Sequence, residues 1–306
     1  MDSNIMKTNK RYAWFAAFLS LLMPGLGQLY CGAITKCLCL LALTNTAAML
    51  SLLALVPRVR LDGTVVVLFS GFSLVIYGVG ILDAFLTARR TRADYALKDY
   101  NRWYAYLLLS LAASAGNIFS VLYVRDNLLM PFRAGSDSMY PAVCKGDKVF
   151  AARNAYREKD PVVGDIVVFL NPEDRRQIFL KRVVALAGDE VEIRNGELFV
   201  NGTKLKREEA PVPTDVPKHI GGEETYFYEI NGQSKYQFVV TANGNPRWRN
   251  LPSTIVPKHQ CFVLGDYRDN SLDSRNFGAI PIAGIVGKVS FIYEPVGNWS
   301  RFGTIR

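Results

Sequence analysis

The residues best suited to chemistry in this sequence are two serines, Ser136 and Ser138, in the stretch from Phe132 to Asp147. If the backbone is extended there, side chains two residues apart point the same way, and both hydroxyls face one spot. Acyl transfer needs a nucleophile such as serine together with a donor for the developing oxyanion. Pro141 restricts the residue before it and so stiffens the segment. The alternative interpretation is a turn with solvated hydroxyls.

A serine nucleophile needs a base, and the histidines do not supply one. The only two, His219 and His259, lie near no carboxylate pattern, which disfavours a Ser-His-Asp arrangement. The base should therefore be a lysine, whose usual pKa of about 10.4 is lowered by burial among apolar side chains. Lys181 is placed for this, because residues 178–180 and 183–184 are apolar. From local sequence alone, Lys181 would more often be a solvated strand lysine.

Three blocks, in this order and at this spacing, resemble the bacterial type I signal peptidases, the Ser/Lys leader peptidases. They are Phe132–Asp147, Phe179–Asp189 and Leu264–Gly278, and the third is long and specific. The resemblance runs from about Leu128 to about Pro295, more than half of the chain. It implies cleavage of N-terminal signal peptides from secreted preproteins after small residues, without a cofactor.

The resemblance implies a role for each residue of the dyad. Ser138, followed by Met139, matches the catalytic serine, and Lys181 matches the general base. Neutral Lys181 would take the Ser138 proton, protonate the leaving amine and then activate water against the acyl-enzyme. The backbone N–H of Ser138 and the hydroxyl of Ser136 would hold the oxyanion.

The third block is expected to support the site. By resemblance, Ser271 hydrogen-bonds the Lys181 amine, and Asp273 pairs with Arg275 beneath the site. A carboxylate and a guanidinium two apart on a strand can meet in this way, and such pairs are usually structural. A tight turn braced by charges is the preferred interpretation for Gly265, Asp266, Arg268 and Asp269.

Small apolar pockets should set the specificity for substrate residues at the first and third positions before the cut. Residues matching the family's pocket flank the nucleophile and the base: Phe132, Ala134, Met139, Phe179 and Leu180. Extended substrate could add as a strand beside the strand of the base. The chain departs from the usual family residues nearby: Gly135 for Pro, Ala142 for Thr, Ala185 for Gly, Ala187 for Pro, and Ala134 for Ile or Val.

The 306 residues carry a net charge of +9, and the apolar runs crowd into the first 125 positions. A basic balance can indicate nucleic-acid binding. Here the charges cluster beside apolar spans, as in the cytoplasmic loops of membrane proteins, so we expect a lipid bilayer and no nucleic acid as partner. The five cysteines include no CxxC pair, and no metal site is predicted. Cys144 and Cys261 could pair if their half of the chain is extracytoplasmic; the oligomeric state stays open.

Apolar segments predict a membrane region over residues 1–127. Cys37–Val56, Thr64–Leu82 and Trp103–Val124 are each long enough to cross a hydrocarbon core of about 30 Å. Their close succession disfavours buried helices of a soluble protein. Tyr12–Thr35 is interrupted at Pro24–Gly27, which predicts a kinked helix or a re-entrant hairpin and not a cleaved signal peptide.

Basic residues between the apolar segments Thr64–Leu82 and Trp103–Val124 set the orientation. The loop contains Arg89, Arg90, Arg92, Lys98 and Arg102, so it should be cytoplasmic. Everything after Val124 then lies outside a bacterial inner membrane that the chain crosses several times. Full crossing by Tyr12–Thr35 would put the basic N-terminus outside, against the same rule. A re-entrant or interfacial segment turning at Pro24–Gly25 is therefore preferred.

Residues 128–306 show a different pattern, with short β-branched and apolar runs between Gly, Asn, Asp and Pro. This predicts an all-β extracytoplasmic catalytic domain after the α-helical transmembrane region. Asn195-Gly196 and Asn201-Gly202 are hairpin-turn signals. The more polar segment at about 203–260 predicts an inserted second β lobe.

Two other functions compete with signal-peptide cleavage. A self-cleaving, repressor-type Ser/Lys peptidase is disfavoured by the membrane spans and by the absence of a DNA-binding region in the sequence. A catalytically idle β-domain on a membrane scaffold, acting in transport or assembly, stays open at this stage.

Overall fold

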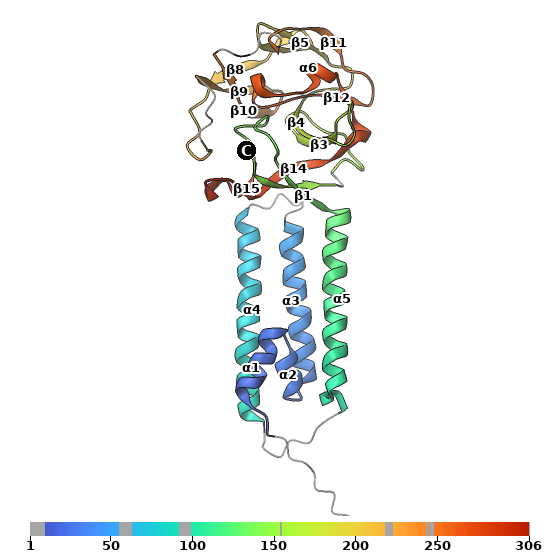
Figure 1. Ribbon diagram of the computed structural model, residues 1–306, viewed down its shortest axis with the longest axis vertical. Coiled ribbons are helices and arrows are strands. Elements are labelled where there is room, and N and C mark those ends of the chain that lie inside the picture. Colours follow the sequence, from blue (N-terminus) through green and yellow to red (C-terminus); the bar gives the residue numbers. More distant parts are fainter. Residues whose placement is uncertain are drawn as a thin grey trace, which may run out of the picture. The chain divides into compact units, whose positions relative to one another are not determined.

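The computed structural model describes residues 10–54, 63–91, 99–153, 155–217, 223–242, 244 and 248–305. The chain divides into two compact units (Figure 1). The helical unit comprises Met1–Leu55 and Val59–Val124, and the β unit comprises Val56–Arg58 and Arg125–Arg306.

The described residues of the helical unit form five helices and a 3-10 turn: α1 (Ala13–Leu22), α2 (Leu26–Tyr30), α3 (Ile34–Ala54), α4 (Gly63–Arg90), η2 (Asp99–Asn101) and α5 (Trp103–Asn127). Among the described residues, Val67–Arg90 and Trp103–Asn127 are long and apolar enough to cross a membrane, and Ile34–Leu50 is a shorter apolar helix. The C-terminal end of the predicted span Cys37–Val56 lies outside the described residues.

The interruption at Pro24-Gly25 is a hairpin between α1 and α2. Gly25 takes a φ of 95°, in the left-handed region that favours glycine. The two ends of the hairpin meet, since the Tyr12 N–H donates to Tyr30 Oη at 3.3 Å. Helix α1 has 10 residues, so it is about 15 Å long, half of a bilayer core. Of the two forms that the sequence predicts, the structure has the hairpin.

A polar cluster, buried at Ser20 and Gln28, holds this hairpin against α3 and α4. Gln28 donates to the Gly80 carbonyl at 2.7 Å and to Asp83 Oδ2 at 3.2 Å, while Ser20 Oγ donates to Gln28 Oε1 at 3.1 Å. Lys36 pairs with the other oxygen of Asp83 at 2.7 Å. Polar groups held away from water need such partners, so the cluster fixes the hairpin in place.

The β unit is organised by an eight-stranded sheet in the order β1-β2-β14-β3-β4-β12-β13, with β15 on β14. Its strands are β1 (Leu129–Arg133), β2 (Lys148–Ala152), β3 (Ile166–Leu170), β4 (Ile178–Leu186), β12 (Gln260–Leu264), β13 (Ile280–Pro281), β14 (Ile285–Glu294) and β15 (Gly303–Thr304). The paired strands run antiparallel. One buried cluster on this sheet joins Val149, Val168 and Val289 to Met139.

Two smaller sheets come between β4 and β12 in the chain. The four-stranded sheet, in the order β11-β5-β6-β7, contains β5 (Glu190–Arg194), β6 (Glu197–Val200), β7 (Thr203–Lys204) and β11 (Leu251–Ile255). The three-stranded sheet, in the order β10-β9-β8, contains β8 (Lys206–Glu209), β9 (Glu224–Asn231) and β10 (Ser234–Thr241). The four-stranded sheet begins ahead of the lobe boundary expected at about residue 203, because pairing joins β5 and β6 to β7 and β11.

Short elements complete the β unit: η4 (Arg268–Asn270), α6 (Ser274–Phe277), η5 (Ile282–Gly284) and η6 (Trp299–Arg301). Both Asn-Gly pairs form hairpin turns, with positive φ at Asn195, Gly196, Asn201 and Gly202. Cys144 and Cys261 are free and buried in different core clusters. The disulfide that the sequence leaves open is therefore not formed.

Candidate active site

The segment between β1 and β2 carries the two serines. The chain turns there, with the Tyr140 N–H donating to the Asp137 carbonyl at 2.9 Å, so the backbone is not extended as the sequence argument assumes. The hydroxyls still meet, because Ser136 Oγ donates to Ser138 Oγ at 3.2 Å. Ser138 is only 7% exposed. A turn, and not strand alternation, brings the two hydroxyls together.

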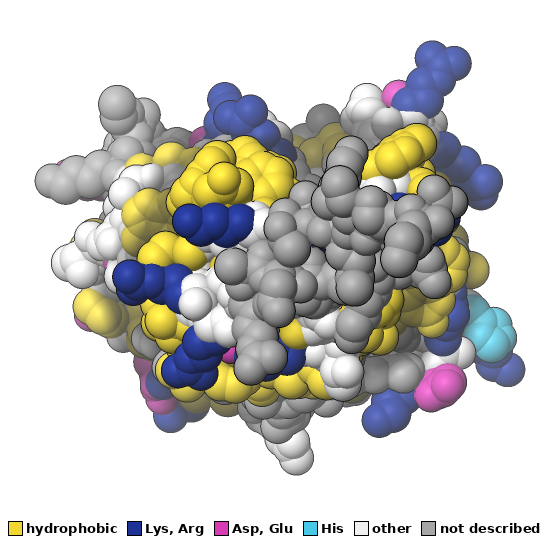
Figure 2. Space-filling model, turned by 90° about the horizontal axis from the view of Figure 1, so that it is seen from below, with side chains coloured by type: hydrophobic (Ala, Val, Ile, Leu, Met, Phe, Trp, Pro, Cys, Tyr) yellow, Lys and Arg dark blue, Asp and Glu magenta, His cyan; other side chains and the backbone are white. Residues whose placement is uncertain are grey.

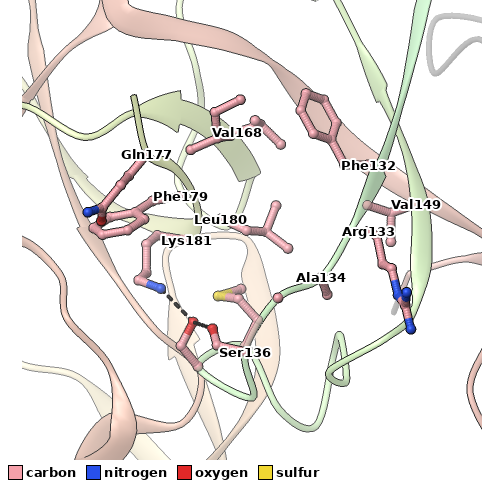
Figure 3. A pocket seen from close by; sticks show the side chains of 14 residues that line it. Phe132, Arg133, Ala134, Ser136, Val149, Val168, Gln177, Phe179, Leu180 and Lys181 are labelled. Carbon is pink, nitrogen blue, oxygen red and sulfur yellow. Dashed lines mark hydrogen bonds between the residues drawn. The ribbon is translucent and has the colours of Figure 1, made fainter. Parts of the chain in front are cut away.

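Strand β4 delivers Lys181 to the same place (Figure 3). Its Nζ donates to Ser138 Oγ at 2.6 Å, and its side chain is 3% exposed. Burial lowers the pKa of Lys181 from 10.5 to about 8, although the nearby carboxylates of Asp273 and Asp266 act in the opposite direction. A lysine in this state can take a proton from the hydroxyl that it touches.

A cavity of about 410 Å³ adjoins the two groups. Every pocket residue predicted from the sequence lines it: Phe132, Ala134, Met139, Phe179 and Leu180. Figure 3 shows Phe132 and Ala134 on the opposite side of the cavity from Phe179 and Leu180.

Sequence reasoning missed Val149, Val168 and Gln177, which also line the cavity. Val149 pairs with Phe132 across β1 and β2, and Val168 pairs with Leu180 across β3 and β4. Only knowledge of the strand register would have identified these two valines as lining the cavity.

The loop after β12 packs against Ser138. The Tyr267 N–H donates to the Ser138 carbonyl at 3.1 Å. A Cβ on Gly265 would lie 2.5 Å from that carbonyl oxygen and closer still to Ser271 Oγ, so the chain needs glycine here. Ser271 is buried, and in the described part of the chain its Oγ makes no hydrogen bond to the Lys181 amine. The hydrogen bond to the Lys181 amine that the resemblance implies is thus not formed.

Asp273 and Arg275 do pair, but at the start of a helix and not along a strand. Arg275 Nε donates to Asp273 Oδ1 at 2.9 Å and Nη2 donates to Oδ2 at 2.8 Å. Asp273 is the N-cap of α6, and its Oδ2 also accepts the Gly265 N–H at 3.0 Å. Burial alone would raise the pKa of Asp273, yet the Arg275 guanidinium holds that pKa below its ordinary value. The pair ties the loop to α6.

Arg182, next to the proposed base, makes an ion pair that sequence reasoning did not find. Its Nε and Nη2 donate to the two oxygens of Asp266 at 2.7 and 2.6 Å, and both side chains are buried. The turn expected at Asp266 is therefore braced from β4 and not only by its own charges. Such two-point pairing fixes geometry as well as charge, so β4 and the loop are held in one register.

Known proteins are similar in sequence to this chain. The family described as signal peptidase, peptidase S26, matches residues 104–294. A probable signal peptidase I-1 of Synechocystis sp. is 34% identical over 190 residues, covering 60% of this chain and 80% of that protein. Signal peptidase IB of Staphylococcus aureus is 33% identical over 195 residues, covering 63% of this chain and 93% of that protein. A crystal structure of a signal peptidase I from Enterococcus faecalis is 28% identical and covers 42% of this chain and 97% of that one, with a TM-score of 0.27.

The matched family and the named relatives define this chain as a serine peptidase. The chain belongs to the signal peptidase family, peptidase S26, as a type I signal peptidase. The family assignment made from the three sequence blocks is confirmed.

Replacing Gly265 with alanine should lower the melting temperature and also lower the peptidase activity of the protein that still folds. The added methyl group would displace the Ser138 carbonyl and Ser271, and a shift of about 1 Å at a reacting group can cost about 10²-fold in rate. Cleavage rates per folded enzyme, with melting curves, measure this. Gly284→Ala is the matched control, because nothing lies within 4 Å of its added Cβ. Wild-type rates in Gly265→Ala would contradict the expectation.

Proposed function

We propose that this membrane-anchored peptidase removes N-terminal signal peptides from secreted preproteins, cutting after small residues with Ser138 as nucleophile and Lys181 as general base. The observation that carries the proposal is the 2.6 Å contact between Lys181 Nζ and Ser138 Oγ, with both side chains buried. A neutral amine takes the hydroxyl proton as Oγ attacks the scissile carbonyl.

The oxyanion formed in that attack needs donors. We assign this role to the backbone N–H of Ser138 and to the hydroxyl of Ser136, which lies 3.2 Å from the nucleophile. Loss of one such donor typically costs about 2.7–4 kcal/mol of transition-state stabilisation.

The second half of the reaction reuses the same amine. Protonated Lys181 gives its proton to the leaving amine of the mature protein, and the peptide bond breaks to leave an ester between Ser138 and the signal peptide. Water then attacks this ester with Lys181 again as base, which regenerates the serine. Ser271, Asp273 and Arg275 support the loop on which this geometry depends.

Extended substrate fits along β4. Strand β12 pairs with β4 only from Arg182 onward, so in the described sheet Ile178–Lys181 have one unpaired edge. A peptide added there receives backbone hydrogen bonds, and its alternate side chains point to the same face. The first and third residues before the cut would therefore enter the apolar cavity, between Phe132 and Leu180. The limited cavity volume favours small side chains.

We also propose that residues 1–127 form the membrane region and residues 128–306 the extracytoplasmic catalytic domain, with an inserted lobe at about 203–260. Within the helical unit, the C-terminal end of α4, with Arg89 and Arg90, lies at the same end as the hairpin. The start of α5 is also there, since Tyr100 Oη donates to the Gly32 carbonyl at 2.7 Å. Figure 2, seen from below, shows Lys and Arg side chains among hydrophobic ones. This end would be cytoplasmic, and the hairpin re-entrant.

The two competing functions fit this chain less well than signal-peptide cleavage does. An idle β-domain would have no use for a lysine that burial keeps ready to accept a proton. A repressor-type peptidase cleaves itself and needs no apolar helices.

Ser138→Ala and Lys181→Met should each abolish preprotein cleavage, lowering kcat/KM by roughly 10⁴-fold or more, because each removes one half of the dyad. Cleavage of a purified preprotein in detergent, with the cut site mapped by mass spectrometry, measures this. Ser300→Ala and Lys204→Met are matched controls at exposed positions. Retention of activity by both dyad variants would refute the proposed function.

Activity should rise with pH through an apparent pKa of about 8. Only neutral Lys181 accepts the Ser138 proton, and burial lowers its pKa to about 8, so the active fraction grows as the solution becomes more alkaline. Asp266 and Asp273 raise this pKa, and Arg275 lowers it. Asp273→Asn should therefore shift the rising part of the pH–activity profile to lower pH. The pH profile of kcat/KM measures both. A flat profile between pH 6 and 9 would contradict the assignment of Lys181 as base.

Cysteine labelling in intact cells tests the sidedness. Among the five cysteines only Cys39 is exposed, so Cys39→Ser gives a quiet background. An impermeant maleimide should label Ser300→Cys in intact cells, and Arg102→Cys only after the membrane is opened. Labelling of Arg102→Cys in intact cells would reverse the proposed orientation.

A further inference from the structure

Glu229 of β9 is a carboxylate with no exposed surface, 0%, in the three-stranded sheet. It accepts hydrogen bonds from three other elements. Arg268 of η4 donates to both its oxygens, at 2.6 and 3.2 Å, Tyr236 of β10 donates at 2.9 Å, and Arg207 of β8 lies 3.4 Å away. Figure 1 shows β8, β9 and β10 side by side. Glu229 thus sits where the sheet meets the loop after β12.

The charge on Glu229 makes this junction rigid. A buried carboxylate is costly unless it is paired and hydrogen-bonded. Burial opposes ionisation, yet the Arg268 guanidinium holds the pKa of Glu229 below its ordinary value, so the pair is ionic. The guanidinium also lies 4.1 Å over the Phe238 ring, which confines it to one position. If Arg268 moved, its guanidinium and the Glu229 carboxylate would each become a buried charge without its partner.

The same sheet holds the neighbours of Arg268. The Val239 N–H donates to the Asp266 carbonyl at 2.9 Å, and the Thr241 N–H donates to Asp269 Oδ2 at 2.8 Å. Tyr267 Oη donates to Glu224 Oε1 of β9 at 3.1 Å, so all four residues from 266 to 269 are tied to β9 or β10. Tyr267 also donates its N–H to the carbonyl of Ser138.

We propose that Glu229 is a positioning residue for catalysis, which acts through Arg268 to hold the 266–269 loop against Ser138 and against Arg182, the neighbour of Lys181. The three-stranded sheet is then a support for the nucleophile and the base. This inference rests on the proposed roles of Ser138 and Lys181. It goes beyond them because it places a residue required for turnover outside the site, in β9.

The position of the cavity makes the effect selective. Its lining comes from β1 to β4 and the segments that follow β1 and precede β4, and includes no residue of β8, β9 or β10. Substrate binding should therefore be unaffected when the junction loosens, while alignment of the dyad should suffer. Loss of Glu229 is expected to lower kcat and to leave KM unchanged.

Glu229→Gln tests this in the full-length enzyme with a preprotein substrate. We expect kcat per folded enzyme to fall about 10²-fold, as for a misplaced reacting group, and KM to stay within about twofold. Glu208→Gln is the matched control. Glu208 is on the adjacent strand β8, where it pairs with Lys206 and Lys235 at the surface, and its variant should keep wild-type kcat. Wild-type kcat in folded Glu229→Gln, or a raised KM at unchanged kcat, overturns the proposal.

A second variant separates positioning from mere stability. Glu229→Gln with Arg268→Met removes both charges and should recover the melting temperature lost in the single variant. If Glu229 positions the loop, kcat stays low in this folded double variant; recovery of kcat together with stability overturns the proposal. If neither the single nor the double variant folds, Tyr236→Phe tests the proposal, because it removes one hydrogen bond to Glu229. We expect kcat of Tyr236→Phe to fall about threefold or more. An unchanged kcat in Tyr236→Phe also overturns the proposal. A wild-type enzyme without activity would instead refute the proposed function.

Discussion

Keeping the amine of Lys181 out of water is the constraint from which the rest of the β unit follows. Burial lowers its pKa from 10.5 to about 8. That shift destabilises the folded state by about 3 kcal/mol below pH 8, and the cost is relieved as the pH rises from about 8 to 10.5. The neighbouring core must offset it. Lys181 lies near the middle of the sheet, with Val167 opposite on β3, so its stem replaces a core side chain.

Two carboxylates near the amine work against its neutral form, and each is matched by an arginine. Asp273 pairs with Arg275, and Asp266 pairs with Arg182, in both cases through two hydrogen bonds. Both pairs hold the loop in place, and Arg275 also lowers the pKa of Lys181, against the effect of the two carboxylates. The Asp273–Arg275 pair therefore contributes both to support of the loop and to the pKa of Lys181, which the proposed function requires to be low.

The sequence was enough to predict that Ser138, Lys181 and Ser136 lie together and to predict five residues of the cavity, because these lie within short blocks. The partners Arg182 and Asp266 are 84 residues apart, and Glu229 and Arg268 are 39 apart. No local pattern marks such pairs, since strand pairing alone brings them together. The expected strand at Asp273 was wrong because this residue caps α6. In the helical unit, Pro24-Gly25 predicted the turn, but the polar cluster around Gln28 depends on packing against α4.

The separation of the cavity from its support has a consequence for specificity. The walls of the cavity that we propose for substrate side chains belong to β1 to β4 and the adjoining turns, whereas the loop behind Ser138 is fixed by β9 and β10. Under the proposed function, changes in wall residues would alter which side chains fit without disturbing Lys181. Ala134, smaller than the Ile or Val expected from the resemblance, is such a position: it lines the cavity, and the contact between Ser138 and Lys181 is present beside it. The proposed function therefore assigns substrate range and rate to different parts of one fold.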